Sequence, residues 1–292
     1  MNSVAVLNNK AIKNLGFVLN QSKSGTFKLF GQLREIAEDM GVSTRETFEF
    51  PVPNGFLEGM DACCVIGGDG TFLSAASEST KYQVPLIGVN RGTLGFLTTY
   101  TAEEIDSLFP SILEGAYDLR RRGLLECCTH DNLVDVALND VVIKSTSVSG
   151  IVHLNVFANE EFVTTYICDG LIFSTPTGST AYTLSAGGPL IHPDSKVISL
   201  TPICPHALSN RSIILPDNVQ LRVENAVPNG QLVVAVDGQR NLSTSEDGTI
   251  AIKLSSQSLQ IAQKVDYSHF DVVRRKLKWS GGYIREPNPN NH

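Results

Sequence analysis

One stretch near the middle of the N-terminal half constrains the fold of this chain more than any other. An apolar run over 62–66 leads directly into Gly67-Gly68-Asp69-Gly70, and a helix is predicted over 71–79. A fully apolar run that ends in a glycine turn and a helix is typical of a buried strand in a parallel sheet. Ligands bind at the carboxyl edge of such sheets, where this turn would lie. We therefore expect an α/β domain with a binding site at the turn.

The rest of the first 120 residues shows the same alternation of strands and helices. Short apolar runs predict strands over 15–19, 47–50 and 85–90, and apolar residues at helical spacing predict helices over 26–40 and 101–113. Thr101 and Glu104 form a capping-box pattern at the start of the last helix. Alternating strands and helices imply a parallel sheet with helices on its faces, so we expect a Rossmann-like α/β domain.

The pattern changes after residue 120. Apolar and polar residues alternate with period two over 134–138, 219–223, 250–254 and 259–261, which predicts antiparallel strands and an all-β sandwich. We expect an N-terminal domain over 1–120, completed by the C-terminal segment 270–292, and a β-sandwich domain over 121–269. The arginines at 120–122 are expected to be solvated at this boundary.

Composition excludes several classes of function. The chain has 292 residues, a net charge of −7 and no run of 18 apolar residues, which favours a globular protein without a transmembrane helix or a nucleic-acid partner. No secretory signal is evident at the N-terminus. The six cysteines form no C-x-x-C pair, and four of them lie as the doublets Cys63-Cys64 and Cys127-Cys128 in apolar runs. We therefore expect the doublets to be buried thiols, and we expect no zinc site and a cytoplasmic location.

Asp69 poses a chemical problem within its turn. Glycines can adopt backbone angles closed to other residues and let a ligand approach, and the N-terminus of the following helix favours phosphate. A carboxylate repels phosphate, so Asp69 needs a metal ion or a hydroxyl whose proton it accepts. Both possibilities indicate phosphoryl transfer. The alternative is a tight turn in which Asp69 caps the next helix.

A second constellation runs from Asp169 to Pro189 as DGLIFSTPTGSTAYTLSAGGP. Its small hydroxyl residues and glycines suit the hydrogen-bonding groups of a nucleotide, and Tyr182 is able to stack on a base or a nicotinamide ring. A plain surface loop is the alternative, although this segment is long for one without a function. Asn139-Asp140 and Asn90-Arg91-Gly92 are weaker signals, each typical of a turn, and Arg91 adds a cation near Asp69.

These blocks together resemble the NAD kinase family. GGDG at 67–70, the Asn-acidic pair at 139–140 and the long block from Asp169 occur in the family's order, and the similarity covers about 16–279. GGDG alone is less specific, because lipid and sphingoid kinases are similar there. The resemblance implies transfer of the γ-phosphoryl group of ATP to the 2′-hydroxyl of the adenosine ribose of NAD, with a divalent metal ion, usually Mg²⁺. It also implies a homodimer or homotetramer, with NAD bound between an α/β domain and a β-sandwich.

The resemblance assigns roles to particular residues. Asp69 would be the catalytic proton acceptor, and the ATP phosphates would contact Gly67, Gly68, Gly70 and Arg91. NAD would contact Asp69 and Gly70 together with a larger set, namely Asn139, Asp140, Asp169, Thr180, Ala181, Tyr182, Thr183, Leu184, Ser185 and Gln239. No metal ligand is assigned.

The sequence departs from the family at two positions. Bacterial members usually have Glu where this chain has Asp140, which is one methylene shorter. Ile167 stands where some members carry a basic residue, which bears on the preference between NAD and NADH. Two other hypotheses remain at this point: a kinase for a lipid or sphingoid substrate, and a dinucleotide-binding regulator without activity.

Overall fold

The computed structural model describes residues 9–92, 95–130, 133–146, 150–207, 209–227, 232–244 and 248–279. Of the predicted C-terminal segment 270–292, residues 280–292 lie outside this description. The chain divides into two compact units. Unit 1 comprises the described residues of 1–75, 84–120 and 261–292, and unit 2 comprises those of 76–83 and 121–260.

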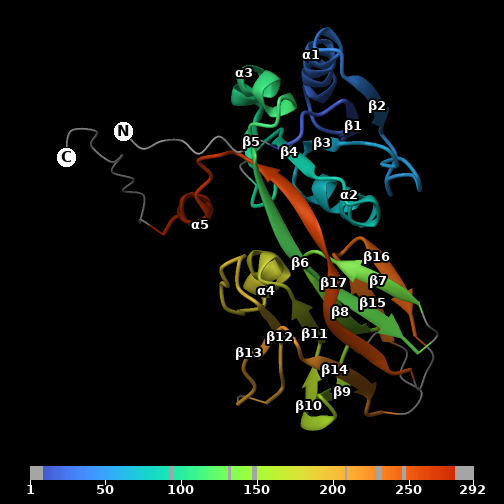
Figure 1. Cartoon of the computed structure of the whole chain (residues 1–292). Coiled ribbons are helices and arrows are strands. Elements are labelled where there is room, and N and C mark those ends of the chain that lie inside the picture. Colours follow the sequence, from blue (N-terminus) through green and yellow to red (C-terminus); the bar gives the residue numbers. More distant parts are fainter. Residues whose placement is uncertain are drawn as a thin grey trace. The chain divides into compact units, whose positions relative to one another are not determined.

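Unit 1 is built on a parallel sheet with helices packed against it (Figure 1). The order within the sheet is β4-β3-β1-β2, and the end of β17 pairs with β4. Its strands are β1 (Asn14–Leu19), β2 (Ser43–Thr47), β3 (Ala62–Gly67), β4 (Leu86–Asn90) and β5 (Tyr100–Thr101). Its helices are α1 (Thr26–Asp39), the first half of α2 (Asp69–Tyr82), α3 (Ala102–Leu113) and α5 (His269–Leu277).

The core of unit 1 follows from the apolar runs that predicted its strands. Every residue of β3 and β4 is buried, as expected for central parallel strands covered on both faces. Phe17 of β1 packs edge-on against Phe30 of α1, with ring centroids 5.2 Å apart. The predicted capping box is confirmed, because Thr101 Oγ1 accepts the N–H of Glu104 and the Glu104 carboxylate accepts the N–H of Thr101.

Unit 2 consists of two antiparallel sheets. One contains β9, β10 and β14, most of β17, β6 and β7, and the other follows the order β13-β12-β11-β8-β15-β16. The strands of the first sheet are β6 (Asp118–Thr129), β7 (Val134–Ala137), β9 (Val152–Ala158), β10 (Glu161–Cys168), β14 (Gln220–Asn225) and β17 (Ile250–Gln263). Those of the second are β8 (Asp140–Ser145), β11 (Gly170–Ser174), β12 (Val197–Ile203), β13 (Ile213–Pro216), β15 (Leu232–Val236) and β16 (Arg240–Ser243).

Residues from both sheets form one core in unit 2. Leu154 of β9 and Val223 of β14 belong to the same buried cluster as Val141 of β8 and Phe173 of β11. Side chains of alternate strand residues point to one face, so this shared cluster is the interior of a sandwich. The prediction of a Rossmann-like α/β domain followed by a β-sandwich is confirmed.

Two local predictions were wrong. The second strand is Ser43–Thr47 and not 47–50, because Phe48 leaves the sheet and stacks on Phe27 with ring centroids 5.4 Å apart. Arg122 is not solvated: it is 5 % exposed, and its guanidinium forms an ion pair with Asp194 at 2.7 Å. All six cysteines are free thiols. Of the two doublets predicted to be buried, Cys63, Cys64 and Cys127 are buried and Cys128 is half-buried, while Cys168 is buried and Cys204 exposed.

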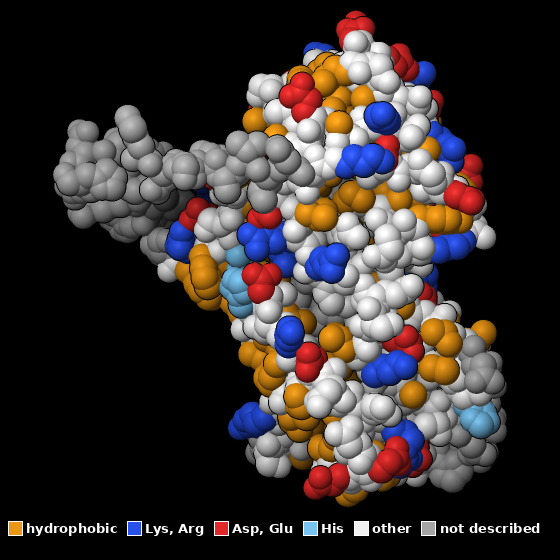
Figure 2. All heavy atoms as spheres, viewed as in Figure 1, with side chains coloured by type: hydrophobic (Ala, Val, Ile, Leu, Met, Phe, Trp, Pro, Cys, Tyr) orange, Lys and Arg blue, Asp and Glu red, His pale blue; other side chains and the backbone are white. Residues whose placement is uncertain are grey.

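The surface carries both signs of charge. Over the face shown in Figure 2, Lys and Arg side chains are interspersed with Asp and Glu, and apolar side chains are scattered among them. No helix within the described residues is long and apolar enough to cross a membrane.

Candidate active site

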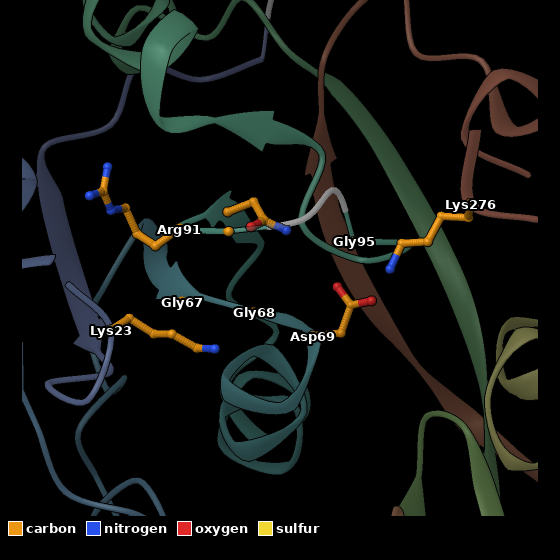
Figure 3. Close-up of a pocket in the computed structure, with 9 residues that line it drawn as sticks. Lys23, Gly67, Gly68, Asp69, Arg91, Gly95 and Lys276 are labelled. Carbon is orange, nitrogen blue, oxygen red and sulfur yellow. The ribbon is translucent and has the colours of Figure 1, made fainter. Parts of the chain in front are cut away.

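A cavity of about 180 Å³ in unit 1 lies at the carboxyl ends of β3 and β4 (Figure 3). Gly67 ends β3, Asn90 ends β4, and the two residues are register partners in the parallel ladder. The sheet edge expected to carry the site therefore does carry a cavity. The residues that line it are Lys23, Gly67, Gly68, Asp69, Asn90, Arg91, Gly92, Gly95 and Lys276.

The glycine turn is required by packing and not by unusual backbone angles. None of Gly67, Gly68 and Gly70 has a φ in the left-handed region, contrary to the expectation from the sequence. A Cβ on Gly67 would lie 2.4 Å from Thr71 Oγ1, whereas a Cβ on Gly68 would meet nothing within 4 Å. Gly67 thus allows α2 to start close to β3, and Gly68 leaves open space beside the start of the helix.

Asp69 is the first residue of α2, and its carboxylate holds the loop that follows β4. Oδ2 accepts the N–H of Phe96 at 2.8 Å. Oδ1 accepts the N–H groups of Leu97 at 3.1 Å and Thr98 at 3.2 Å, and the Thr98 hydroxyl at 3.1 Å. Asp69 therefore interacts with a segment 27–29 residues away, and not with its own helix as the capping interpretation proposed.

Neighbouring residues allow this close approach. A Cβ on Gly95 would lie 2.1 Å from Asp69 Oδ1 and 2.2 Å from Thr98 Oγ1, so the loop accepts only glycine there without rearranging. Buried Asn90 donates from Nδ2 to Thr98 Oγ1 at 3.0 Å, which orients the hydroxyl that Asp69 accepts. The carboxylate is thus held in one place by the loop after β4.

Three cations line the cavity, and two of them were not found from the sequence. Arg91 was predicted, but its guanidinium donates to the Ser24 carbonyl, from Nη2 at 2.8 Å and from Nε at 3.3 Å, and it points away from the turn (Figure 3). Lys23 and Lys276 were missed, because Lys276 lies 207 residues along the chain from Asp69 and only the fold brings them to one cavity.

In unit 2, the Asn139-Asp140 pair forms a turn that is held by a buried carboxylate. Asp237 accepts the N–H of Leu138 at 3.0 Å, of Asn139 at 2.7 Å and of Asp140 at 3.3 Å. Its side chain is fully buried. Asp237 was not among the predicted site residues, although an Asp-Gly pair between two strands signals a specific turn.

Asp140 lies beside the second constellation. Its carboxyl group is buried and accepts the backbone N–H of Tyr182 at the start of α4 (Tyr182–Ser185). Burial, and secondly the charge of Asp237, raise the pKa of Asp140 to about 7, although Lys144 and the Tyr182 N–H oppose the shift. Burial also raises the pKa of Asp237, and the backbone N–H groups that donate to its carboxylate offset this rise only in part. Lys144 Nζ lies 5.0 Å from the centroid of the Tyr182 ring.

The segment after Asp169 is not a plain surface loop. After β11 it forms a short 3₁₀ helix η1 (Thr177–Thr180) and then α4, and residues 170–179 are buried. Many of its hydroxyl groups bond within unit 2 and are not free for a nucleotide. Ser174 Oγ donates to the Asn139 carbonyl at 3.1 Å, and Thr175 Oγ1 donates to the Leu138 carbonyl at 2.5 Å. These bonds join the segment to the 139–140 turn.

The remaining predicted residues differ in exposure. Thr183 is buried, while Thr180, Ala181 and Leu184 are half-buried. Tyr182 is 38 % exposed, and Asp169, Ser185 and Gln239 are exposed. Within unit 1 the structure brings Gly67, Gly68, Asp69 and Arg91 to one cavity, and Gly70 follows in the first turn of α2. Within unit 2 it brings Asp140 against Tyr182 and the Asn139 carbonyl close to Gly178.

The fold and the lining of the cavity indicate the class of protein. A glycine turn, a helix N-terminus and lysines around one carboxylate suit a phosphate-bearing nucleotide and a proton transfer. Comparison with known proteins gives the family. The family model for the ATP-NAD kinase N-terminal domain matches residues 15–117, and the model for the ATP-NAD kinase C-terminal domain matches residues 138–264.

Relatives of similar length support the same family. The chain is 36 % identical to NAD kinase from Solibacter usitatus over 281 residues, covering 92 % of this chain and 98 % of that one. It is 35 % identical to NAD kinase from Aquifex aeolicus over 277 residues, covering 91 % and 99 %. The chain therefore belongs to the ATP-NAD kinase family.

Solved structures share the fold. The crystal structure of yeast NADH kinase complexed with NADH has a TM-score of 0.83 at 23 % identity, covering 96 % of this chain and 91 % of that chain. An NAD kinase from Archaeoglobus fulgidus in complex with ATP has a TM-score of 0.76 at 23 % identity, covering 91 % and 98 %. At this level of identity the similarity supports the fold alone.

Proposed function

We propose that this chain catalyses the transfer of the γ-phosphoryl group of ATP to the 2′-hydroxyl of the adenosine ribose of NAD, which yields NADP and ADP. Membership of the ATP-NAD kinase family is the general support. The single structural observation that carries the mechanism is the position of Asp69, fixed by four donors at the start of α2 beside a cavity with cations.

Asp69 is proposed as the proton acceptor. Each carboxylate oxygen has two lone pairs, and among the described residues Oδ2 accepts one donor, the Phe96 N–H. Oδ2 therefore retains a lone pair for the ribose hydroxyl. In the proposed step the hydroxyl proton passes to Asp69, the ribose oxygen forms a bond to the γ-phosphorus, and the bond from that phosphorus to the ADP oxygen breaks.

The glycine turn and the start of α2 are proposed to hold the donor phosphates. The first N–H groups of a helix have no partner within the helix and carry partial positive charge. The open space beside Gly68 lets a phosphate approach this backbone. Gly67, Gly68, Gly70 and Arg91 are the residues that the sequence assigned to this role.

NAD is proposed to bind residues of unit 2. The turn at Asn139 and Asp140 is fixed by Asp237 and contacts the start of α4, so its two side chains are preorganised. A carboxylate at Asp140 would accept a ribose hydroxyl, and Tyr182 would offer its ring to a base or nicotinamide. The other proposed contacts are Asp169, Thr180, Ala181, Thr183, Leu184, Ser185 and Gln239.

A divalent metal ion, proposed to be Mg²⁺, would enter with ATP. The described residues contain no group of three His, Cys, Asp or Glu side chains placed to hold a metal ion. Among these residues Asp69 is the only carboxylate that lines the cavity, and its free lone pair is proposed for the ribose hydroxyl. The lining therefore fits Mg²⁺ that would be held chiefly by the donor phosphates and waters. When bound, the ion would neutralise charge on the phosphates.

We also propose a cytoplasmic enzyme that assembles as a homodimer or homotetramer. Its first domain would comprise 1–120 with 270–292, and its NAD-binding domain 121–269. These proposals rest on the family resemblance and on the cysteine pattern. Analytical ultracentrifugation would test the assembly.

The test of the reaction is NADP formation from NAD, ATP and Mg²⁺, read by an NADP-specific dehydrogenase, in wild type and Asp69→Asn. Loss of the proton acceptor should reduce kcat by about 10²–10⁴-fold. Asn also presents an N–H₂ group to the donors of the 96–98 loop, so the thermal midpoint of both proteins must be compared.

Thr98→Val is the matched control, because it removes one of the four bonds to Asp69 and leaves the carboxylate. We expect it to reduce kcat by at most about tenfold, because three backbone N–H groups still hold the carboxylate. If Asp69→Asn and Thr98→Val reduce kcat equally, Asp69 positions the 96–98 loop and is not the proton acceptor. Inactivity of the wild type with several donors and metals would instead indicate a dinucleotide-binding protein.

A further inference from the structure

The cavity in unit 1 contains cations that the predicted site leaves without a role. Arg91 is the cation nearest to the glycine turn in sequence, but its guanidinium is bound to the Ser24 carbonyl. It also lies so close to Gly25 that a Cβ there would be 2.1 Å from Nη2. Arg91 therefore joins the β4 end to the β1–α1 connection, and its charge is directed away from the turn.

Lys23 and Lys276 differ from Arg91 in this respect. Within the described residues, neither ammonium group forms an ion pair or a side-chain hydrogen bond. Three other described lysines do have acidic partners: Lys10 with Asp61 at 3.4 Å, Lys264 with Glu104 at 2.8 Å and Lys253 with Glu126 at 3.0 Å. Two ammonium groups without acidic partners are thus directed at one small cavity in a chain of net charge −7.

Asp69, the single carboxylate that lines the cavity among the described residues, does not neutralise them. Both oxygens of Asp69 accept hydrogen bonds from the 96–98 loop, and Asp69 begins α2, where the helix N-terminus stabilises a negative charge. The space between the two lysines therefore keeps an excess of positive charge.

The size of the cavity restricts the ligand. Its volume of about 180 Å³ corresponds to about six waters at roughly 30 Å³ each. Pockets that enclose a whole drug-sized ligand have about 300–1,000 Å³. The cavity thus has room for a short chain of phosphates.

We propose that Lys23 and Lys276 are the two cations that bind the polyphosphate chain of the phosphoryl donor, one on each side of the glycine turn. This inference rests on the proposed function and names the residues that hold its donor. Lys23 lies in the connection after β1 and Lys276 on α5, and their side chains approach the turn from opposite sides (Figure 3). Such a pair would contact the phosphate chain from two sides.

Lys276 is also connected to Asp69 through one residue. Its Nζ lies 5.3 Å from the centroid of the Phe96 ring, and the Phe96 N–H donates to Asp69 Oδ2. The ring orients the ammonium group at the cavity by a cation–π contact. Phosphate binding at Lys276 therefore takes place next to the loop that fixes the carboxylate.

The experiment compares Lys23→Gln and Lys276→Gln with two matched controls, Lys28→Gln and Arg275→Gln. The controls remove exposed charges from α1 and α5 that do not line the cavity. Calorimetry measures binding of inorganic tripolyphosphate to each full-length protein, and kinetics measure KM for ATP and for NAD. We expect each cavity variant to weaken tripolyphosphate binding and raise KM for ATP by about tenfold or more, with KM for NAD unchanged.

The two readouts separate this inference from the proposed function. If the wild type phosphorylates NAD and the cavity variants behave like the controls, the lysine assignment is overturned and the reaction stands. If no variant or wild type phosphorylates NAD, yet tripolyphosphate binding depends on both lysines, the lysine assignment stands and the proposed function fails. An equal loss in all four variants would indicate long-range charge and overturn the assignment.

Discussion

Gly95 decides whether Asp69 can be held by the loop that follows β4. The carboxylate reaches three backbone N–H groups because Gly95 places no side chain between them. We predict that Gly95→Ala lowers the free energy of unfolding by about 1–3 kcal/mol, since a Cβ would lie 2.1 Å from Asp69 Oδ1 and the loop must move. Urea denaturation measures the loss.

Gly92→Ala is the matched control in the same connection. A Cβ on Gly92 would meet only Asn90 Oδ1, at an ordinary 3.8 Å. We expect this variant to remain within about 0.5 kcal/mol of wild type. Similar losses in the two variants would mean that the connection tolerates substitutions poorly everywhere, and would remove the specific role of Gly95.

At the same scale, the sequence predicted Asp69 but not its partners. A carboxylate within a glycine turn is chemically unusual, so the local pattern was sufficient to select it. Its contacts at 96–98 depend on the parallel pairing of β3 and β4, which no local pattern encodes. Lys276 was missed for the same reason. Asp237 was missed because its local sequence is that of an ordinary turn, which does not show that the carboxylate is buried and accepts backbone N–H groups.

At the scale of elements, strong apolar periodicity predicted position well. The helix expected over 26–40 is Thr26–Asp39, and the strand expected over 62–66 is Ala62–Gly67. The predicted strand bounds are wrong where the strands pair through backbone hydrogen bonds without apolar side chains. β2 is an edge strand with mostly exposed polar side chains, and β17 continues through the polar residues 255–258 that had separated two predicted runs. Hydrogen bonds between strands require no apolar side chain.

The capping box of α3 allows a direct test of an element. Thr101→Ala removes the hydroxyl that accepts the Glu104 N–H, so we predict a loss of about 1 kcal/mol in the free energy of unfolding. α3 does not line the cavity, and kcat should be unchanged. Thermal and urea denaturation measure the stability, and NADP formation measures the activity.

Ser107→Ala is the control on the same helix. Ser107 is inside α3 and its hydroxyl donates to the Glu104 carbonyl of the previous turn. Alanine has a higher helix propensity than serine, so stability should be equal or slightly higher. A destabilisation equal to that of Thr101→Ala would show that the hydroxyl at the N-cap has no special contribution.

At the scale of the whole molecule, chemistry is divided between two units of different construction. Unit 1 places Asp69, the proposed proton acceptor, and cations at the edge of a parallel sheet. Unit 2 places a buried carboxyl pair, Asp140 and Asp237, in the interior of its turn network. Burying two carboxyl groups side by side is costly when both are charged. The stability of the molecule should therefore depend on pH through this pair.

The sign of that dependence follows from linkage. The pKa of Asp140 is raised to about 7 in the folded chain, whereas an unfolded aspartate titrates near about 3.9. Between these values the folded state binds more protons than the unfolded state, so the free energy of unfolding falls as pH rises from about 4 to about 7. The difference of about three pKa units corresponds to a loss of about 4 kcal/mol, which levels off above pH 7.

Asp140→Asn separates this contribution from all others, because the amide is neutral at every pH. We predict that wild type loses stability relative to Asp140→Asn between pH 4 and pH 7, measured by urea denaturation at half-unit intervals. NAD binding should follow the opposite trend in wild type, since the ionised carboxylate is the better acceptor for a ribose hydroxyl. Parallel stability curves for the two proteins would show that Asp140 does not titrate in this range. In that case Asp140 would be ionised across this pH range, and NAD binding would not depend on its protonation.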